Sequence, residues 1–104
     1  MARVIPVTEP EWVLGLSHNP VHDLQLISRI IGGKMETVEL DKNTALIINA
    51  DLIDDGSASA KRVEKNHLNT AASDLIFRVY NVVMPVIGTA IIVDMDDFGL
   101  PSTL

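Results

Sequence analysis

Residues 19 to 40, NPVHDLQLISRIIGGKMETVEL, constrain the fold more than any other stretch of the chain. Asn19 followed by Pro20 is a strong helix start. Asn caps the open amides of the first turn, and Pro at the first helical position loses no hydrogen bond. Gly32 suits the left-handed residue that ends many helices, and Gly33 lets the chain reverse. The stretch therefore predicts a helix, a two-glycine stop and a strand.

The spacing of apolar residues supports this reading on both sides of the glycines. In the predicted helix they form one stripe, made of Val21, Leu24, Ile27, Ile30 and Ile31. From residue 34 the period changes to two, as in a strand, although neither face is purely apolar. Residues 41 to 43 supply turn chemistry, and TALIIN at 44 to 49 is apolar enough to lie centrally in a sheet. Residues 34 to 49 are therefore predicted to form a hairpin.

A second hairpin is predicted before the helix. RVIPV at 3 to 7 and EWVLGL at 11 to 16 read as short strands, and Thr8-Glu9-Pro10 between them reads as a turn. Pro6 has no amide to donate to a ladder, so the first strand should lie at a sheet edge or end there.

The second half of the chain predicts one more helix and one more strand. The helix is capped by Asn66 or Asn69 and ends near Asn81. Its expected buried side consists of Leu68, Ala71, Ala72, Leu75, Ile76 and Val79. Pro85 prevents a helix just beyond it, and GTAIIV at 88 to 93 is typical of a buried strand.

These elements fit one α+β domain over residues 1 to 104. We expect a mixed or antiparallel sheet of about four to five strands with two helices packed on it. Residues 51 to 65 are predicted to form a mobile surface loop, and residues 95 to 104 a loose tail.

Charge and composition exclude several classes of function. With 14 acidic and 8 basic residues the net charge is −6, which argues against a direct nucleic-acid ligand. The absence of cysteine excludes disulfides and thiolate sites. No apolar run resembles a signal peptide or reaches the roughly 20 residues that span a bilayer. We therefore expect a soluble cytoplasmic protein that does not bind membranes.

No catalytic or metal-binding constellation is predicted. His18 and His22 are four residues apart, but Pro20 between them breaks the helical spacing that a metal pair would need. The acidic residues at 94 to 97 lack the length and the final glutamate of a calcium loop. We expect no catalytic residue, no metal, no cofactor and no enzymatic activity.

Two features are candidate binding residues. Trp12 is the one residue of the type that often anchors interfaces, although a partly buried strand residue is the simpler interpretation. The only local basic cluster could hold an anionic ligand or partner, or could be a solvated entry to the second helix. Its members are Lys61, Arg62, Lys65, Asn66 and His67.

Four segments together resemble a family of small proteins of phages and their bacterial hosts whose function is unknown. They are LQLISRIIGGKMETVEL at 24 to 40, ALIIN at 45 to 49, KNHLNTAA around Asn66 and VIGTAIIV at 86 to 93. The family has a leucine-rich helix, a glycine step into a strand, a hairpin whose second strand ends in Asn, and a late glycine-led strand. The resemblance implies a phage or mobile-element gene expressed in a bacterial cytoplasm, but it assigns no role to any residue.

Three hypotheses of function follow. The first is a non-enzymatic accessory protein that binds a host protein, for host takeover or counter-defence, through the surface around Trp12 and residues 51 to 65. The alternative is a homo-oligomer that sequesters a small anionic, nucleotide-type signal with Lys61, Arg62 and Lys65. The third is a hydrolase, which would require the acidic residues at 94 to 97 to meet a histidine in a deep pocket.

Overall fold

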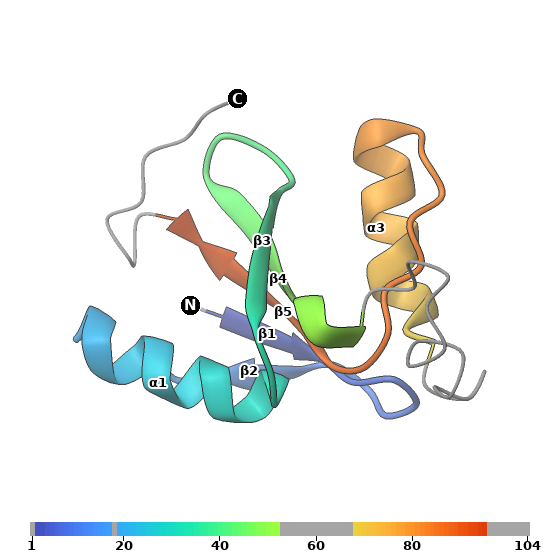
Figure 1. Ribbon diagram of the computed structural model, residues 1–104. Helices are drawn as coiled ribbons and strands as arrows, with labels where there is room; N and C mark the ends of the chain where they lie inside the picture. Colours follow the sequence, from blue (N-terminus) through green and yellow to red (C-terminus); the bar gives the residue numbers. More distant parts are fainter. Residues whose placement is uncertain (1, 18, 53–67, 96–104) are drawn as a thin grey trace.

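The computed structural model describes residues 2–17, 19–52 and 68–95 (Figure 1). Over these residues the chain forms a five-stranded sheet and two α-helices, which confirms the α+β class. The elements in chain order are β1 (Ala2–Ile5), β2 (Trp12–Leu14), α1 (Pro20–Ile31), β3 (Met35–Glu39), β4 (Thr44–Asn49), the short 3₁₀ turn η1 (Ala50–Leu52), α3 (Thr70–Tyr80) and β5 (Ala90–Asp94).

The sheet is antiparallel throughout, with strand order β2-β1-β5-β4-β3. Both predicted hairpins are confirmed, β1 with β2 and β3 with β4. For the strand before Pro6, the sequence predicted either an edge position or an end at the proline. The second outcome is found, because β1 is flanked by β2 and β5 but ends at Ile5, one residue before Pro6.

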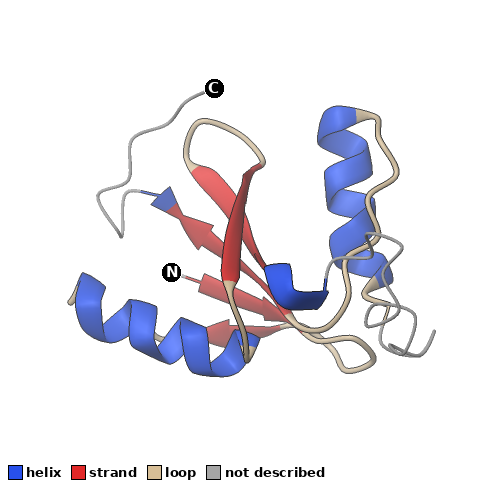
Figure 2. Ribbon diagram, in the orientation of Figure 1, coloured by secondary structure: helices blue, strands red, loops and turns tan. Residues whose placement is uncertain are grey.

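The two helices cover opposite faces of the sheet (Figure 2). The side chains of β4 alternate between these faces: Ala45 and Ile47 pack with α1, whereas Leu46 and Ile48 pack with α3. Because both faces are covered, β4 and β5 are nearly continuous apolar runs. The core is therefore aliphatic and consists of two layers, one on each side of the sheet.

Helix α1 begins and ends as predicted, but its apolar stripe is only partly buried. The side chain of Asn19 accepts the His22 amide at 3.3 Å. Ile27 and Ile31 are buried, whereas Val21 is 68% exposed. Asp23 explains the difference, because its Oδ1 accepts both the amide and the hydroxyl of Ser17, at 2.9 and 2.7 Å, on the buried side. Val21 lies two residues earlier, about 200° around the helix from that side.

The two glycines after α1 have different roles. Gly32 is the left-handed C-cap, with φ 79°, and its amide donates to the Ser28 carbonyl at 2.9 Å. Gly33 is required for a different reason, because a side chain at this position would not fit. A Cβ there would lie 2.6 Å from Asn49 Oδ1 and 2.8 Å from Asp51 Oδ2.

Asn49 and Asp51 approach Gly33 because they close the corner between α1 and the hairpin. Asn49 Nδ2 donates to the Ile31 carbonyl at 3.0 Å, and Asn49 Oδ1 accepts the Asp51 amide at 2.9 Å. Asp51 Oδ2 then accepts the Lys34 amide at 2.9 Å. The last strand residue of the hairpin thus satisfies a carbonyl at the end of the helix.

We predict that alanine is tolerated differently at three glycines. Gly33→Ala should lower the free energy of unfolding by about 2 kcal/mol, because the new methyl displaces Asn49 and leaves the Ile31 carbonyl unsatisfied. Gly32→Ala should cost about 1 kcal/mol from its positive φ. Gly15→Ala, with no atom within 4 Å of the added Cβ, serves as the control and should change stability by less than about 0.5 kcal/mol.

Urea denaturation of the three variants measures this order. Equal stabilities for Gly33→Ala and Gly15→Ala would contradict the packing of Gly33 against Asn49.

Candidate functional site

The buried side chain of Asn69 positions the start of α3. Its Oδ1 accepts the Ala72 amide at 3.0 Å, which makes it the N-cap that the sequence predicted as one of two choices. Its Nδ2 donates to the Ile5 carbonyl at 2.8 Å and to the Gly88 carbonyl at 3.0 Å. One carboxamide therefore joins the helix to the end of β1 and to the segment that enters β5.

Ser73 and Asn69 hold the chain beyond α3 against the helix itself. Ser73 Oγ donates to the Asn69 carbonyl and accepts the Val86 amide, each at 2.8 Å. The Asn69 amide donates to the Val86 carbonyl at 2.7 Å. After Asn81 ends the helix in a left-handed conformation, φ 55°, the chain therefore returns along α3.

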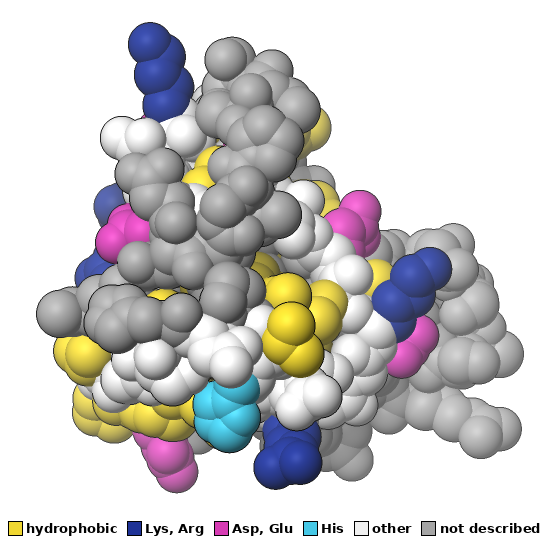
Figure 3. Space-filling view, turned by 90° about the vertical axis from the view of Figure 1, so that its left-hand side faces the viewer, with side chains coloured by type: hydrophobic (Ala, Val, Ile, Leu, Met, Phe, Trp, Pro, Cys, Tyr) yellow, Lys and Arg dark blue, Asp and Glu magenta, His cyan; other side chains and the backbone are white. Residues whose placement is uncertain are grey.

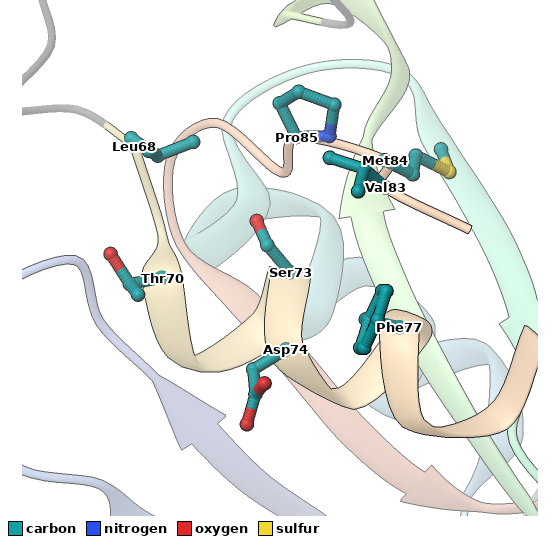
Figure 4. A pocket seen from close by; sticks show the side chains of 8 residues that line it. All are labelled: Leu68, Thr70, Ser73, Asp74, Phe77, Val83, Met84 and Pro85. Atoms are coloured by element: carbon teal, nitrogen blue, oxygen red, sulfur yellow. The ribbon is translucent and has the colours of Figure 1, made fainter. Parts of the chain in front are cut away.

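A groove of about 270 Å³ lies between α3 and this returning segment (Figure 4). Helix α3 supplies one wall and the returning chain the other, while Leu68 lies at one end. The helix residues are Thr70, Ser73, Asp74 and Phe77, and the opposite residues are Val83, Met84 and Pro85. The lining is mostly apolar.

Apolar side chains stay exposed around this groove. Val83 is 82% exposed and Phe77 is 44% exposed, and Leu68 and Val82 are exposed beside them. Met84 is half-buried, and it packs against the core cluster under α3. The groove is therefore an apolar surface continuous with the core, fixed in place by the hydrogen bonds of Asn69 and Ser73.

Two other hollows are weaker candidates. One, of about 480 Å³, lies over Val21, Leu24 and Arg29, and all the described residues that line it belong to α1. In Figure 3, which looks from the side where α1 begins, hydrophobic side chains gather along the lower part of that face.

The other hollow, of about 240 Å³, is charged and lies between α3 and the first hairpin. Its charges are already paired: Arg3 with Glu11 at 3.2 Å, and Arg78 with Asp74 at 2.8 Å. The two positive and two negative side chains balance each other, so the described lining residues carry no net charge that would attract a charged ligand.

Of the binding residues predicted from the sequence, the structure places one. Trp12 is 44% exposed on β2 and is paired with Val4, whose side chain packs in the cluster under α1. Residues opposite each other in an antiparallel pair point to the same face, so Trp12 lies on the side of the sheet away from α3 and the groove. Lys61, Arg62, Lys65, Asn66 and His67 lie outside the described residues, as does most of the predicted loop at 51 to 65.

The described residues contain no group of three or more His, Asp or Glu placed to hold a metal. Within the same residues no helix is long and apolar enough to cross a membrane. Asp94 is exposed at the end of β5, while Asp96 and Asp97, which the hydrolase hypothesis needs, lie outside the described residues.

Sequence reasoning did not identify the groove residues. Val83 belongs to an apolar run, and the run alone does not tell which of its members are exposed. Phe77 did carry a signal, because it falls outside the predicted buried stripe. Phe77 shares one helical face with Thr70, Ser73 and Asp74, because these residues are three or four positions apart. An aromatic residue on an otherwise polar face is a candidate for a contact surface.

No protein-family model matches the chain. Neither a curated protein nor a solved structure matches it either.

We predict that the two helix caps differ in their effect on stability. Asn69→Ala should lower the free energy of unfolding by about 3 kcal/mol, because it removes a cap and leaves two carbonyls without their donor. Asn19→Ala, at an exposed cap, should cost about 1 kcal/mol. Chemical denaturation measures both, and similar losses at the two positions would show that the extra bonds of Asn69 contribute little.

Proposed function

We propose that the protein acts by binding another protein, whose apolar anchor side chain enters the groove between α3 and residues 83 to 85. The observation that carries the proposal is the exposure of Phe77 and Val83 on the two walls of a groove that hydrogen bonds hold in shape. Exposed apolar surface costs solubility, and contiguous patches of it commonly mark interaction sites.

The size and lining of the groove favour a protein partner over a small ligand. Its volume of about 270 Å³ lies at the small end of the range for small-molecule pockets, which is roughly 300–1,000 Å³. Small ligands are oriented by a few open polar groups. Of the polar side chains in the lining, the hydroxyl of Ser73 is occupied by two hydrogen bonds within the chain, which leaves Thr70 and Asp74. Apolar contact with one or two anchor side chains is therefore the main interaction that this surface offers.

Charge indicates which residues should flank the anchor. The chain carries a net charge of −6, which attracts basic partners at long range and speeds their association. Asp74 lines the groove, and among the described residues its exposed carboxylate is paired with the still more exposed Arg78 of the same helix. We therefore expect an apolar anchor with a lysine or arginine beside it in the partner.

The resemblance to small phage and bacterial proteins implies where this partner is found. A protein of a phage or mobile element would meet it in the host bacterial cytoplasm, so host takeover or counter-defence is the proposed role. The sequestration of a small anionic signal rests on residues 61 to 65, and no feature of the groove favours it.

We predict that a charge in the groove abolishes partner binding while the same charge elsewhere does not. Val83→Lys places an ammonium in the groove at the lining residue Val83, which is 82% exposed. Val21→Lys places one on α1, on the other side of the sheet, where Val21 is 68% exposed. Both variants and the wild type serve as bait in bacterial lysate, followed by binding measurements on the purified captured protein.

The expected result is at least a tenfold loss of affinity for Val83→Lys, with unchanged melting temperatures and wild-type affinity for Val21→Lys. Trp12→Ala separates this proposal from the earlier hypothesis of a contact around Trp12. If Trp12→Ala lost binding and Val83→Lys kept it, the groove would not be the binding site.

A further inference from the structure

The two edges of the sheet differ in how they are protected from pairing with another strand. An open edge presents unpaired amides and carbonyls, and proteins commonly shield it with charges or with covering groups. Strand β3 forms one edge and β2 the other. Their side chains and surroundings show which of the two can accept a further strand.

The β3 edge is shielded. Glu36 and Glu39 lie within its five residues, and Lys34 precedes them. The hydroxyl of Tyr80, at the end of α3, donates to the carbonyl of Glu39. The Lys34 carbonyl accepts the amide of Ala50, the residue that follows β4, and the Leu40 amide donates to the Thr44 carbonyl. In an antiparallel ladder, successive residues direct their backbone groups alternately toward the paired strand and away from it. Lys34 and Leu40 bond toward β4, so the Glu39 carbonyl points away from β4, and Tyr80 occupies this acceptor of the open edge.

The β2 edge is apolar. Its three residues are Trp12, Val13 and Leu14, and Val13 is 60% exposed. The neighbouring charge, Glu11, is paired with Arg3 of β1 at 3.2 Å. Nothing among the described residues donates a side-chain hydrogen bond to the β2 backbone in the manner of Tyr80.

We propose that β2 pairs with β2 of a second copy of this chain, antiparallel, about a two-fold axis at Val13. Such an interface is isologous, so each residue must suit the one opposite it. The axis places Val13 opposite Val13, Trp12 opposite Leu14, and Glu11 opposite Gly15. The Val13 and Trp12–Leu14 contacts are apolar, and Glu11 faces a glycine instead of a second charge. Trp12 of each copy extends the core cluster to which the other's Leu14 belongs.

Charge separation favours this pairing over a pairing of two β3 strands. In the β2 pair the two Glu11 residues are four positions apart, roughly 14 Å along the strands and beyond the ~10 Å screening length at 0.1 M salt. An equivalent β3 pair centred on Thr37 brings the two Glu36 residues to roughly 7 Å along the strands, within that length. For a chain with net charge −6, this difference selects β2.

The proposal is independent of the groove, because Trp12 points to the face opposite α3. It identifies the contact made by the exposed Trp12 as a second copy of the chain. The pairing is short, so we expect a dimer that dissociates on dilution.

Sedimentation equilibrium between about 10 μM and about 1 mM tests the association. We expect the mass to rise from 11.3 kDa toward twice that value with concentration. Val13→Lys should remain at 11.3 kDa throughout, while Thr37→Lys at the β3 edge should dimerise like the wild type. A wild type that stays monomeric, or a dimer that Val13→Lys leaves intact, overturns the proposal.

Cysteine cross-linking tests the register, since the chain has no cysteine of its own. Directly opposed residues have Cβ atoms about 5 Å apart, close enough for a disulfide after a small shift. Val13→Cys should therefore convert to a disulfide dimer at least tenfold faster than Thr37→Cys under mild oxidation. Equal rates overturn the proposal. A monomeric chain whose β2 edge pairs with a strand of another protein also overturns the proposal. That outcome would be seen as protection of the β2 backbone amides from hydrogen exchange in the complex alone.

Discussion

The carboxamide of Asn69 is the interaction on which the arrangement of α3 depends. Three segments meet there that are distant in sequence: the end of β1, the start of α3 and the entry to β5. Asparagine suits this junction because its side chain offers two donors and an acceptor, and here all three functions are used. Asn69 is fully buried among aliphatic side chains, where each unmade hydrogen bond is costly, so the network favours this placement of the helix.

A second asparagine performs the corresponding task on the other face. Asn49 joins the last carbonyl of α1 to the hairpin, as Asn69 joins the first turn of α3 to the sheet. The buried hydrophobic side chains of the strands are aliphatic, and they bury area without specifying direction. The apolar layers therefore favour collapse, while the two buried amides determine where each helix lies. The groove beside α3 follows from this arrangement, because Ser73 continues the Asn69 network to Val86.

The parts of the fold that could be predicted are those determined by neighbouring residues. Asn19-Pro20, Gly32 and the turn at 41 to 43 act locally, so the helix boundaries and both hairpins followed from the sequence. The interior position of β1, the exposure of Val21 and the groove did not follow, because each depends on which distant segment packs alongside. The close approach of Asn49 to Gly33 is of this kind too, since residues 33 and 49 meet only after the hairpin forms.

The central claim is that α3 and residues 82 to 87 form one preformed unit, so that the groove exists before any partner binds. Native-state hydrogen exchange of the Asn69 and Val86 amides tests it most directly, because their hydrogen bonds join the start of α3 to the returning segment. The account predicts opening free energies within about 1 kcal/mol of those for the paired amides of β4 and β5. Exchange of Val86 at the rate of an exposed loop amide would show instead that the groove opens freely, and would contradict the account.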